Sequence, residues 1–197
     1  MTDDSYAKSA AYHEAGHVVV AAVQGLRLLK SGIHVDPADG TGISYYECRK
    51  PDSSYGIDSF GERTIISLFA GLSAQRKFHP TCTGASASAD EDHASRLLMN
   101  MYIPRIFPGT SAFKASMVQL ENAKAKFREM ANQLVEKYWS AIDALAQHLW
   151  AQPLTPKIPV STKSVGQSGS PFEKRIDGTS IVSILTEHGV LASVTDE

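Results

Sequence analysis

The chain has 197 residues, of which 43% are hydrophobic, and a formal net charge of −2 at pH 7. This length and composition can bury one core, so we expect a single domain spanning residues 1–197. The near-neutral charge argues against a nucleic-acid partner, and the longest purely hydrophobic run, Val18–Val23, is too short for a membrane segment. Two cysteines and an N-terminus without a signal-peptide pattern are typical of a cytoplasmic protein.

The first predicted helix runs from about Ser5 to Gln24 and carries the motif H-E-x-x-H at positions 13–17. Residues four apart share one face of a helix, so the imidazoles of His13 and His17 can bind a single ion. Glu14 lies about 100° further round, within reach of a water on that ion. Two neutral histidine ligands, a general base and an open coordination position are typical of a zinc peptidase.

This helix is hydrophobic on nearly all sides, which is typical of a buried helix. Buried imidazoles and carboxylates are costly unless they are paired or bound to metal. Gly16 costs about 1 kcal/mol relative to alanine in a helix interior. Either another backbone approaches closely at the site, or Gly16 is a packing residue with no chemistry nearby.

The third ligand is not part of the same motif. The longer form H-E-x-x-H-x-x-G-x-x-H requires glycine and histidine where this chain has Val20 and Val23. The ligand must therefore come from elsewhere, from a carboxylate or from one of the histidines His34, His79, His93, His148 and His188.

Two strands, Ser31–Pro37 and Ile43–Cys48, are expected after the first helix, joined by a turn. A second helix is expected over Ser59–Phe78, where small residues at 70–74 allow another helix to pack closely. The fold class is therefore mainly α (α+β): a helical zinc-peptidase domain with a small β-hairpin or sheet beside the H-E-x-x-H helix.

A third helix is expected from Ala89 to about Ile103, opened by a capping box at Ser88. Its first turn is densely charged. One interpretation is favourable negative charge at a helix N-terminus, and the other is that one of these residues is the missing ligand. The cluster consists of Asp90, Glu91, Asp92 and His93.

The region Ser111–Trp150 has helical periodicity, and its length predicts a bend or break between Phe113 and Leu120. Its aromatic residues, among them Tyr138 and Trp139, are expected in the core. Residues Pro153–Arg175 are rich in proline, serine, threonine and glycine, which predicts a flexible insertion. A short helix over 180–188 is expected to follow.

These motifs together resemble the peptidase domain of the FtsH family of AAA+ zinc proteases. The family pattern A-Y-H-E-A-G-H-A is matched at 11–18, with Val18 for the last alanine, and a strand-turn-strand is matched at 31–44. The A-G-x-x-A-E helix is matched from Ala70, with Gln75 in place of the acid. The C-terminal patterns A-L-A-x-x-L and D-G-x-x-I are matched at 144–149 and 177–181.

The resemblance implies His13, His17 and Asp90 as ligands of Zn²⁺, with Glu14 as the catalytic base. In the family, the third ligand is the aspartate of a T-G-A-S-N-D-x-x-x-A segment. Aligning back from Ala94 puts Asp90 on that ligand, whereas aligning forward from position 83 requires two extra residues. His93 returns to the same helical face as Asp90, so it is the main competitor or a close neighbour.

The activity implied by the resemblance is that of a zinc-dependent metalloendopeptidase acting on a polypeptide substrate. The family's ATPase domain, Walker motif and membrane anchor have no counterpart in this sequence, so a separate AAA+ ATPase partner and a homo-oligomer are the expected context. The alternative is a non-catalytic or partner-dependent metal-binding regulatory module of the same fold. A purely structural zinc site would use a fourth protein ligand, for instance His93 or Glu91.

Overall fold

The computed structural model describes residues 4–48, 50, 58–82, 88–102, 111–157 and 170–196. Over these residues the fold is mainly helical with one small sheet, as the sequence predicts. The helices are α1 (Asp4–Val23), α2 (Ser59–Phe78), α3 (Ser88–Tyr102), α4 (Ser111–Lys137), α5 (Trp139–Ala151) and α6 (Gly178–Glu187). The strands are β1 (Leu28–Asp36), β2 (Thr41–Tyr46), β3 (Thr155–Pro156), β4 (Phe172–Ile176) and β5 (Val194–Thr195).

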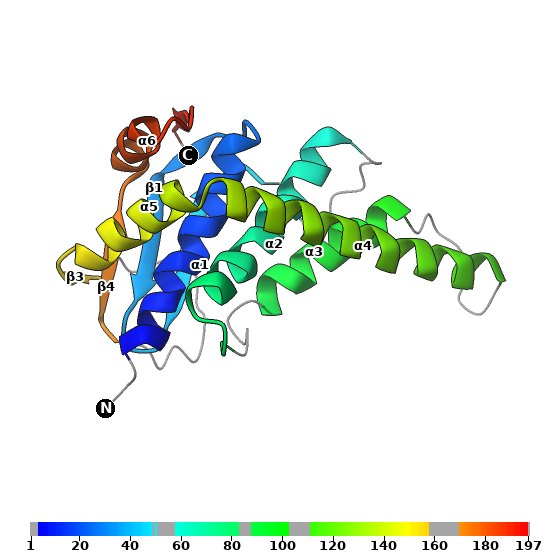
Figure 1. The fold of residues 1–197 in the computed structure, drawn as a ribbon, viewed down its shortest axis with the longest axis horizontal. Coiled ribbons are helices and arrows are strands. Elements are labelled where there is room, and N and C mark those ends of the chain that lie inside the picture. The colour runs from blue at the N-terminus through cyan, green and yellow to red at the C-terminus, as the bar shows by residue number, and fades with distance from the viewer. Residues whose placement is uncertain are drawn as a thin grey trace.

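Helix α1 is the buried centre of the fold, in contact with α2, α5 and the strands β1 and β2 (Figure 1). A Cβ atom added to Gly16 would lie 2.6 Å from Cβ of Ala74 and 2.7 Å from the carbonyl oxygen of Ala70. The backbones of α1 and α2 therefore approach closely at the H-E-x-x-H motif. Of the two explanations for Gly16, the structure supports the close approach of another element at the site.

The sheet has the order β2-β1-β4-β3, and β5 pairs in parallel with the start of β1. The β1–β2 and β1–β4 pairs are antiparallel, and Val35 of β1 lies between Gly42 and Lys174. Both hairpin strands begin earlier than predicted, at Leu28 and Thr41, because Leu28 pairs with Tyr46 and Thr41 pairs with Asp36. This order leaves β2 at one edge of the sheet.

The predicted flexible insertion Pro153–Arg175 is ordered at both ends. Thr155 of β3 pairs with Glu173 of β4, and Arg175 of β4 pairs with His34 of β1. Residues 158–169 lie outside the described part of the chain. Composition could not reveal these strands, because β4 pairs with β1, more than 100 residues earlier in the sequence, and β3 pairs only with β4.

The predicted break between Phe113 and Leu120 is wrong: α4 is continuous over Ser111–Lys137, and the chain breaks at Tyr138 instead. Tyr138 has φ −108° and ψ 22°, and its carbonyl oxygen accepts the first hydrogen bonds of α5. The break lets Trp139 stack on Tyr12 of α1, with ring centroids 5.6 Å apart. The position of the break is therefore set by the packing of α5 on α1 rather than by a helix-breaking residue.

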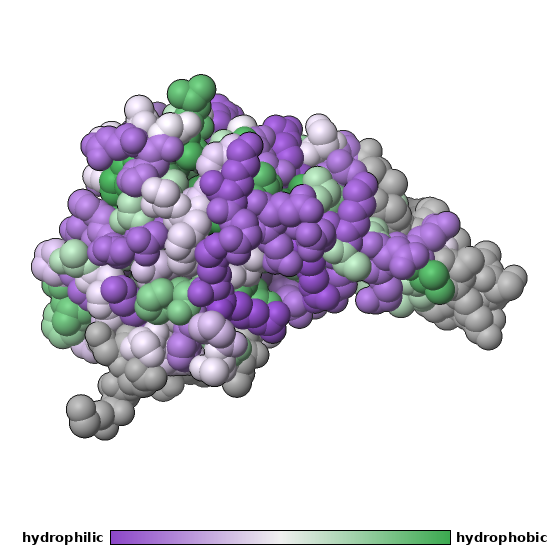
Figure 2. Space-filling view, viewed as in Figure 1, coloured by the Kyte–Doolittle hydropathy of each residue, from purple (hydrophilic) through white to green (hydrophobic). Residues whose placement is uncertain are grey.

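The face of the molecule crossed by α4 and α5 carries mainly hydrophilic side chains, with small separate hydrophobic areas (Figure 2). Within the described ranges, every helix falls short of the length and hydrophobicity that a membrane span requires.

Candidate metal centre

Helix α1 presents all three charged or ionisable residues of the motif to the interior. His13, Glu14 and His17 are 3%, 5% and 3% exposed. The two imidazoles lie edge to face, with ring centroids 4.6 Å apart and Nε2 atoms 3.0 Å apart. The four-residue spacing therefore brings two nitrogen donors to one point, as the motif predicts.

Asp90, in the first turn of α3, completes a triangle of donor atoms. Its Oδ2 lies 2.9 Å from Nε2 of His13 and 3.2 Å from Nε2 of His17. Around a tetrahedral ion with ligand bonds of about 2.0–2.1 Å, donors are roughly 3.3 Å apart, so small movements would suffice to bind one. These three residues could hold a metal ion.

Both histidines are held in the tautomer that leaves Nε2 free for a metal. Nδ1–H of His17 donates to the carbonyl oxygen of Ser67, at 2.7 Å, and Nδ1 of His13 lies 3.2 Å from Oε1 of Gln75. The hydroxyl of Ser9 donates to the carbonyl of Tyr6, so it accepts from Nε2 of Gln75 at 3.0 Å. That bond orients the amide with its oxygen toward His13. Such outer partners fix ligand orientation in metal sites.

Gly71 of α2 forms the floor beneath the two histidines. An added Cβ would lie 2.4 Å from Nε2 of His17 and 2.8 Å from Nε2 of His13. A side chain at this position would collide with the nitrogen atoms that could bind a metal ion. The small residues predicted to allow close helix packing therefore also make room for the donor atoms.

The charges of the metal-free cluster are strongly coupled. Burial opposes a charged His17, but the carboxylate of Asp90 outweighs it and raises the pKa of His17 to about 9. Burial likewise opposes a charged Asp90, yet the two histidines hold its pKa well below the usual range. Without metal, the cluster therefore retains a proton at neutral pH, which a bound cation would displace.

A pocket of about 380 Å³ opens over the donor triangle. Its walls include Glu14 from α1, Gly42 and Tyr46 from β2, and His93 from α3. Burial, together with the nearby groups of Cys48, Asp90 and Glu14, raises the pKa of Tyr46 well above 10. Its ring lies 6.4 Å from that of His17, between centroids.

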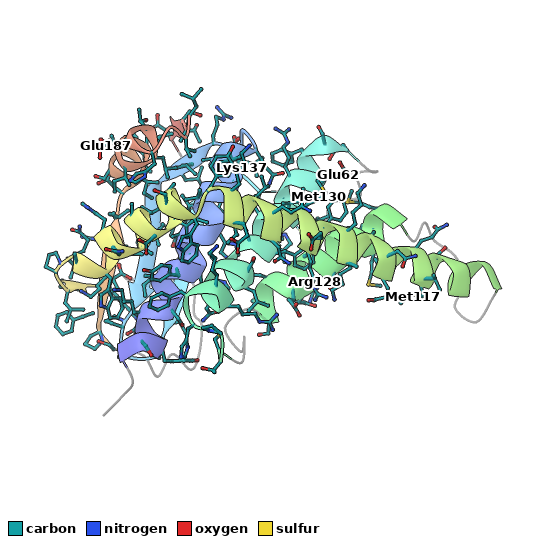
Figure 3. The ribbon with its side chains drawn as sticks, viewed as in Figure 1. Glu62, Met117, Arg128, Met130, Lys137 and Glu187 are labelled. Carbon is teal, nitrogen blue, oxygen red and sulfur yellow. The ribbon has the colours of Figure 1, made fainter. Side chains whose placement is uncertain are left out.

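The other residues of the acidic cluster are directed elsewhere. Oε1 of Glu91 accepts a hydrogen bond of 2.5 Å from Arg128, which points from α4 toward α3 (Figure 3). Asp92 pairs with Arg96 one turn along α3, at 2.8 Å. His93 lines the pocket beside Asp90 but is not part of the donor group. Helix geometry thus separates Asp90 from its neighbours.

The remaining candidate histidines also lie outside this donor group. His34 on β1 lies 3.1 Å from Glu173 of β4, and His188, which follows α6, lies 3.1 Å from the hydroxyl of Ser140. His79 caps the end of α2, and His148 belongs to the last turn of α5.

Gly71 and Gln75 belong to the A-G-x-x-A-E pattern, but their contacts with the histidines were not predicted. Ser67, Gly42 and Tyr46 were not singled out by any motif. The small residues at 70–74 were the available signal for Gly71. The others depend on how α2 and β2 pack on α1, which sequence spacing does not encode.

No model of a known protein family matches the chain, and a search of curated proteins finds no significant relative.

Proposed function

We propose that the chain is a zinc-dependent metalloendopeptidase that resembles the peptidase domain of the FtsH family. The observation that carries the proposal is an incomplete donor set facing a pocket that also contains a carboxylate. Among the described residues, three ligand atoms converge and a fourth histidine, cysteine, aspartate or glutamate does not join them. A catalytic zinc keeps such an open position, whereas a structural zinc is closed by a fourth protein ligand.

Zinc bound to His13, His17 and Asp90 would acidify a water molecule and polarise the scissile carbonyl. Glu14, in the wall of the same pocket, takes a proton from the attacking water and returns it to the leaving amine. Tyr46, which lines the same pocket, would stabilise negative charge on the carbonyl oxygen through its hydroxyl.

The position of β2 supports a polypeptide substrate. It is an edge strand, and Gly40, Thr41, Gly42, Ile43 and Ser44 all line the pocket. An extended peptide can add to an exposed sheet edge through backbone hydrogen bonds that are largely independent of sequence. Binding there would place a peptide bond beside the metal without requiring a free chain end, which favours an endopeptidase.

The competing function is a non-catalytic or partner-dependent regulatory module that binds metal. The open donor set and the pocket carboxylate favour the peptidase. The test is cleavage of unfolded casein and of short peptides by the zinc-loaded protein, followed by chelation and restoration of zinc. We expect cleavage that stops on chelation and returns with zinc. Zinc binding without cleavage of either substrate would favour the regulatory module.

The resemblance also places a separate AAA+ ATPase and a homo-oligomer in this proposal. Cleavage of unfolded casein but not of a stable folded protein would support the need for an unfolding partner. Equal cleavage of unfolded casein and of the folded protein would show that an unfolding partner is not needed.

A further inference from the structure

Gly42 of β2 lies directly against the side chain of Glu14. A Cβ atom added at Gly42 would lie 2.7 Å from both Cγ and Oε1 of Glu14, and 3.0 Å from its Cδ. Real Cβ atoms essentially never approach other atoms below 3.0 Å. Any other residue at position 42 would therefore require the side chain of Glu14 or the backbone of β2 to move.

The backbone does not explain this glycine. Gly42 pairs with Val35 in a regular antiparallel register, and it is not among the described glycines with positive φ. Gly40, in the preceding turn, has φ +70° and is explained by its backbone conformation. Glycine inside a strand weakens it and often marks a close approach, and the approaching group here is Glu14.

Glu14 can relocate only into the pocket that it lines. Glu14 is 5% exposed, and its helix is fixed by close packing against α2. Gly71 provides the same kind of clearance beneath the histidine Nε2 atoms. Gly71 of α2 therefore leaves room for the two histidines, and Gly42 of β2 leaves room for the carboxylate of Glu14.

We propose that Gly42 is the positioning residue for Glu14, whose carboxylate keeps its place in the pocket because this strand residue has no side chain. The catalytic meaning of that position rests on the proposed peptidase function. A displacement of about 1 Å in a catalytic group can cost on the order of 100-fold in rate.

The test is a double-mutant cycle of Gly42→Ala and Glu14→Ala, measured first on the metal-free protein by thermal unfolding. Overpacking by one methyl group should lower Tm by roughly 5 °C when Glu14 is present. In the Glu14→Ala background the clash is gone, so Gly42→Ala should leave Tm unchanged or raise it. An equal loss in both backgrounds would overturn the proposal. If Gly42→Ala does not fold, recovery of folding by Glu14→Ala supports it and failure to recover contradicts it.

The zinc-loaded proteins provide the second readout. We expect Gly42→Ala to keep one metal per chain and to lose about 100-fold in kcat, with KM little changed. A raised KM with unchanged kcat would instead show that the glycine clears space for substrate. If the wild type cleaves nothing, the peptidase function fails, while the unfolding cycle still decides whether Gly42 and Glu14 are coupled.

Discussion

At the residue scale, the two metal-facing histidines are held by different outer partners. His17 donates Nδ1–H to a backbone carbonyl, whereas His13 contacts the amide oxygen of Gln75. A neutral amide makes its histidine a weaker electron donor than a carboxylate would. Gln75, where the FtsH pattern has an acid, therefore distinguishes this site from that pattern without changing the tautomer it requires.

Removal of Asp90 tests the third ligand. Asp90→Ala should weaken zinc binding by more than about 100-fold, since loss of a direct ligand exceeds the usual cost of losing an outer partner. Asp92→Ala is the matched control: its carboxylate pairs with Arg96, so affinity should barely change. Competition against a zinc chelator measures both. If His93→Ala loses zinc and Asp90→Ala does not, the assignment is wrong.

The stability of the metal-free protein should fall as pH rises from about 6.5 to about 9. His17 has a folded-state pKa near 9, against 6.5 for the unfolded chain. Its contribution is therefore fully present below pH 6.5 and lost as pH passes 9. Thermal unfolding with a chelator present measures this. Asp90→Asn removes the charge that raises the pKa, so the wild type and this variant should differ more at pH 6.5 than at pH 9. A constant difference would contradict the coupling.

Gly71 offers a test that leaves every ligand in place. Gly71→Ala should reduce zinc affinity by roughly 10–100-fold, the range for an altered outer shell, because the methyl group displaces the histidine Nε2 atoms. Alanine is favoured over glycine in a helix by about 1 kcal/mol, so the helix itself gains. The clash should lower Tm in Gly71→Ala, and His17→Ala, which removes the nearer imidazole, should reduce that loss. Wild-type zinc affinity in Gly71→Ala would show that a glycine beneath the histidines is not needed for zinc binding.

At the element scale, α2 and α3 complete the site that α1 begins: α2 lies beneath the two histidines, and α3 lies beside them. Gly71 and Gln75 of α2 contact the histidines, while α3 contributes Asp90. An ion pair between Glu91 and Arg128 connects the first turn of α3 to α4. The guanidinium of Arg128 also lies over the ring of Phe69, 5.2 Å from the ring centroid. The position of Asp90 is thus coupled to the contact between its own helix, α3, and α4.

Arg128→Met should weaken zinc binding by no more than about fivefold, because a partly exposed ion pair contributes about 0–1 kcal/mol. Arg96→Met is the matched control, since Arg96 pairs within α3 and does not connect it to another helix. Chelator competition at low and high salt should show the difference shrinking as salt screens the pair. Equal effects of the two substitutions would show that the α3–α4 contact does not position Asp90.

At the scale of the whole molecule, the motif helix was predictable because a four-residue spacing determines which side chains share a face. The acidic turn holding Asp90 was visible as a charge cluster, and the family resemblance selected one residue from it. Gln75 and Gly42 were not predictable, because their roles arise from the packing of α2 and β2 on α1. The break at Tyr138 and the strand β4 likewise follow from long-range packing and pairing.

The most direct test of the proposed peptidase function compares wild type and Glu14→Gln for casein cleavage and zinc content in the same preparation. Glutamine is nearly isosteric with glutamate but cannot take the proton of the attacking water. Both proteins should hold about one zinc per chain, and only the wild type should cleave, whereas His17→Ala should lose the metal. Cleavage by Glu14→Gln at the wild-type rate, or equal zinc in His17→Ala, would contradict the account.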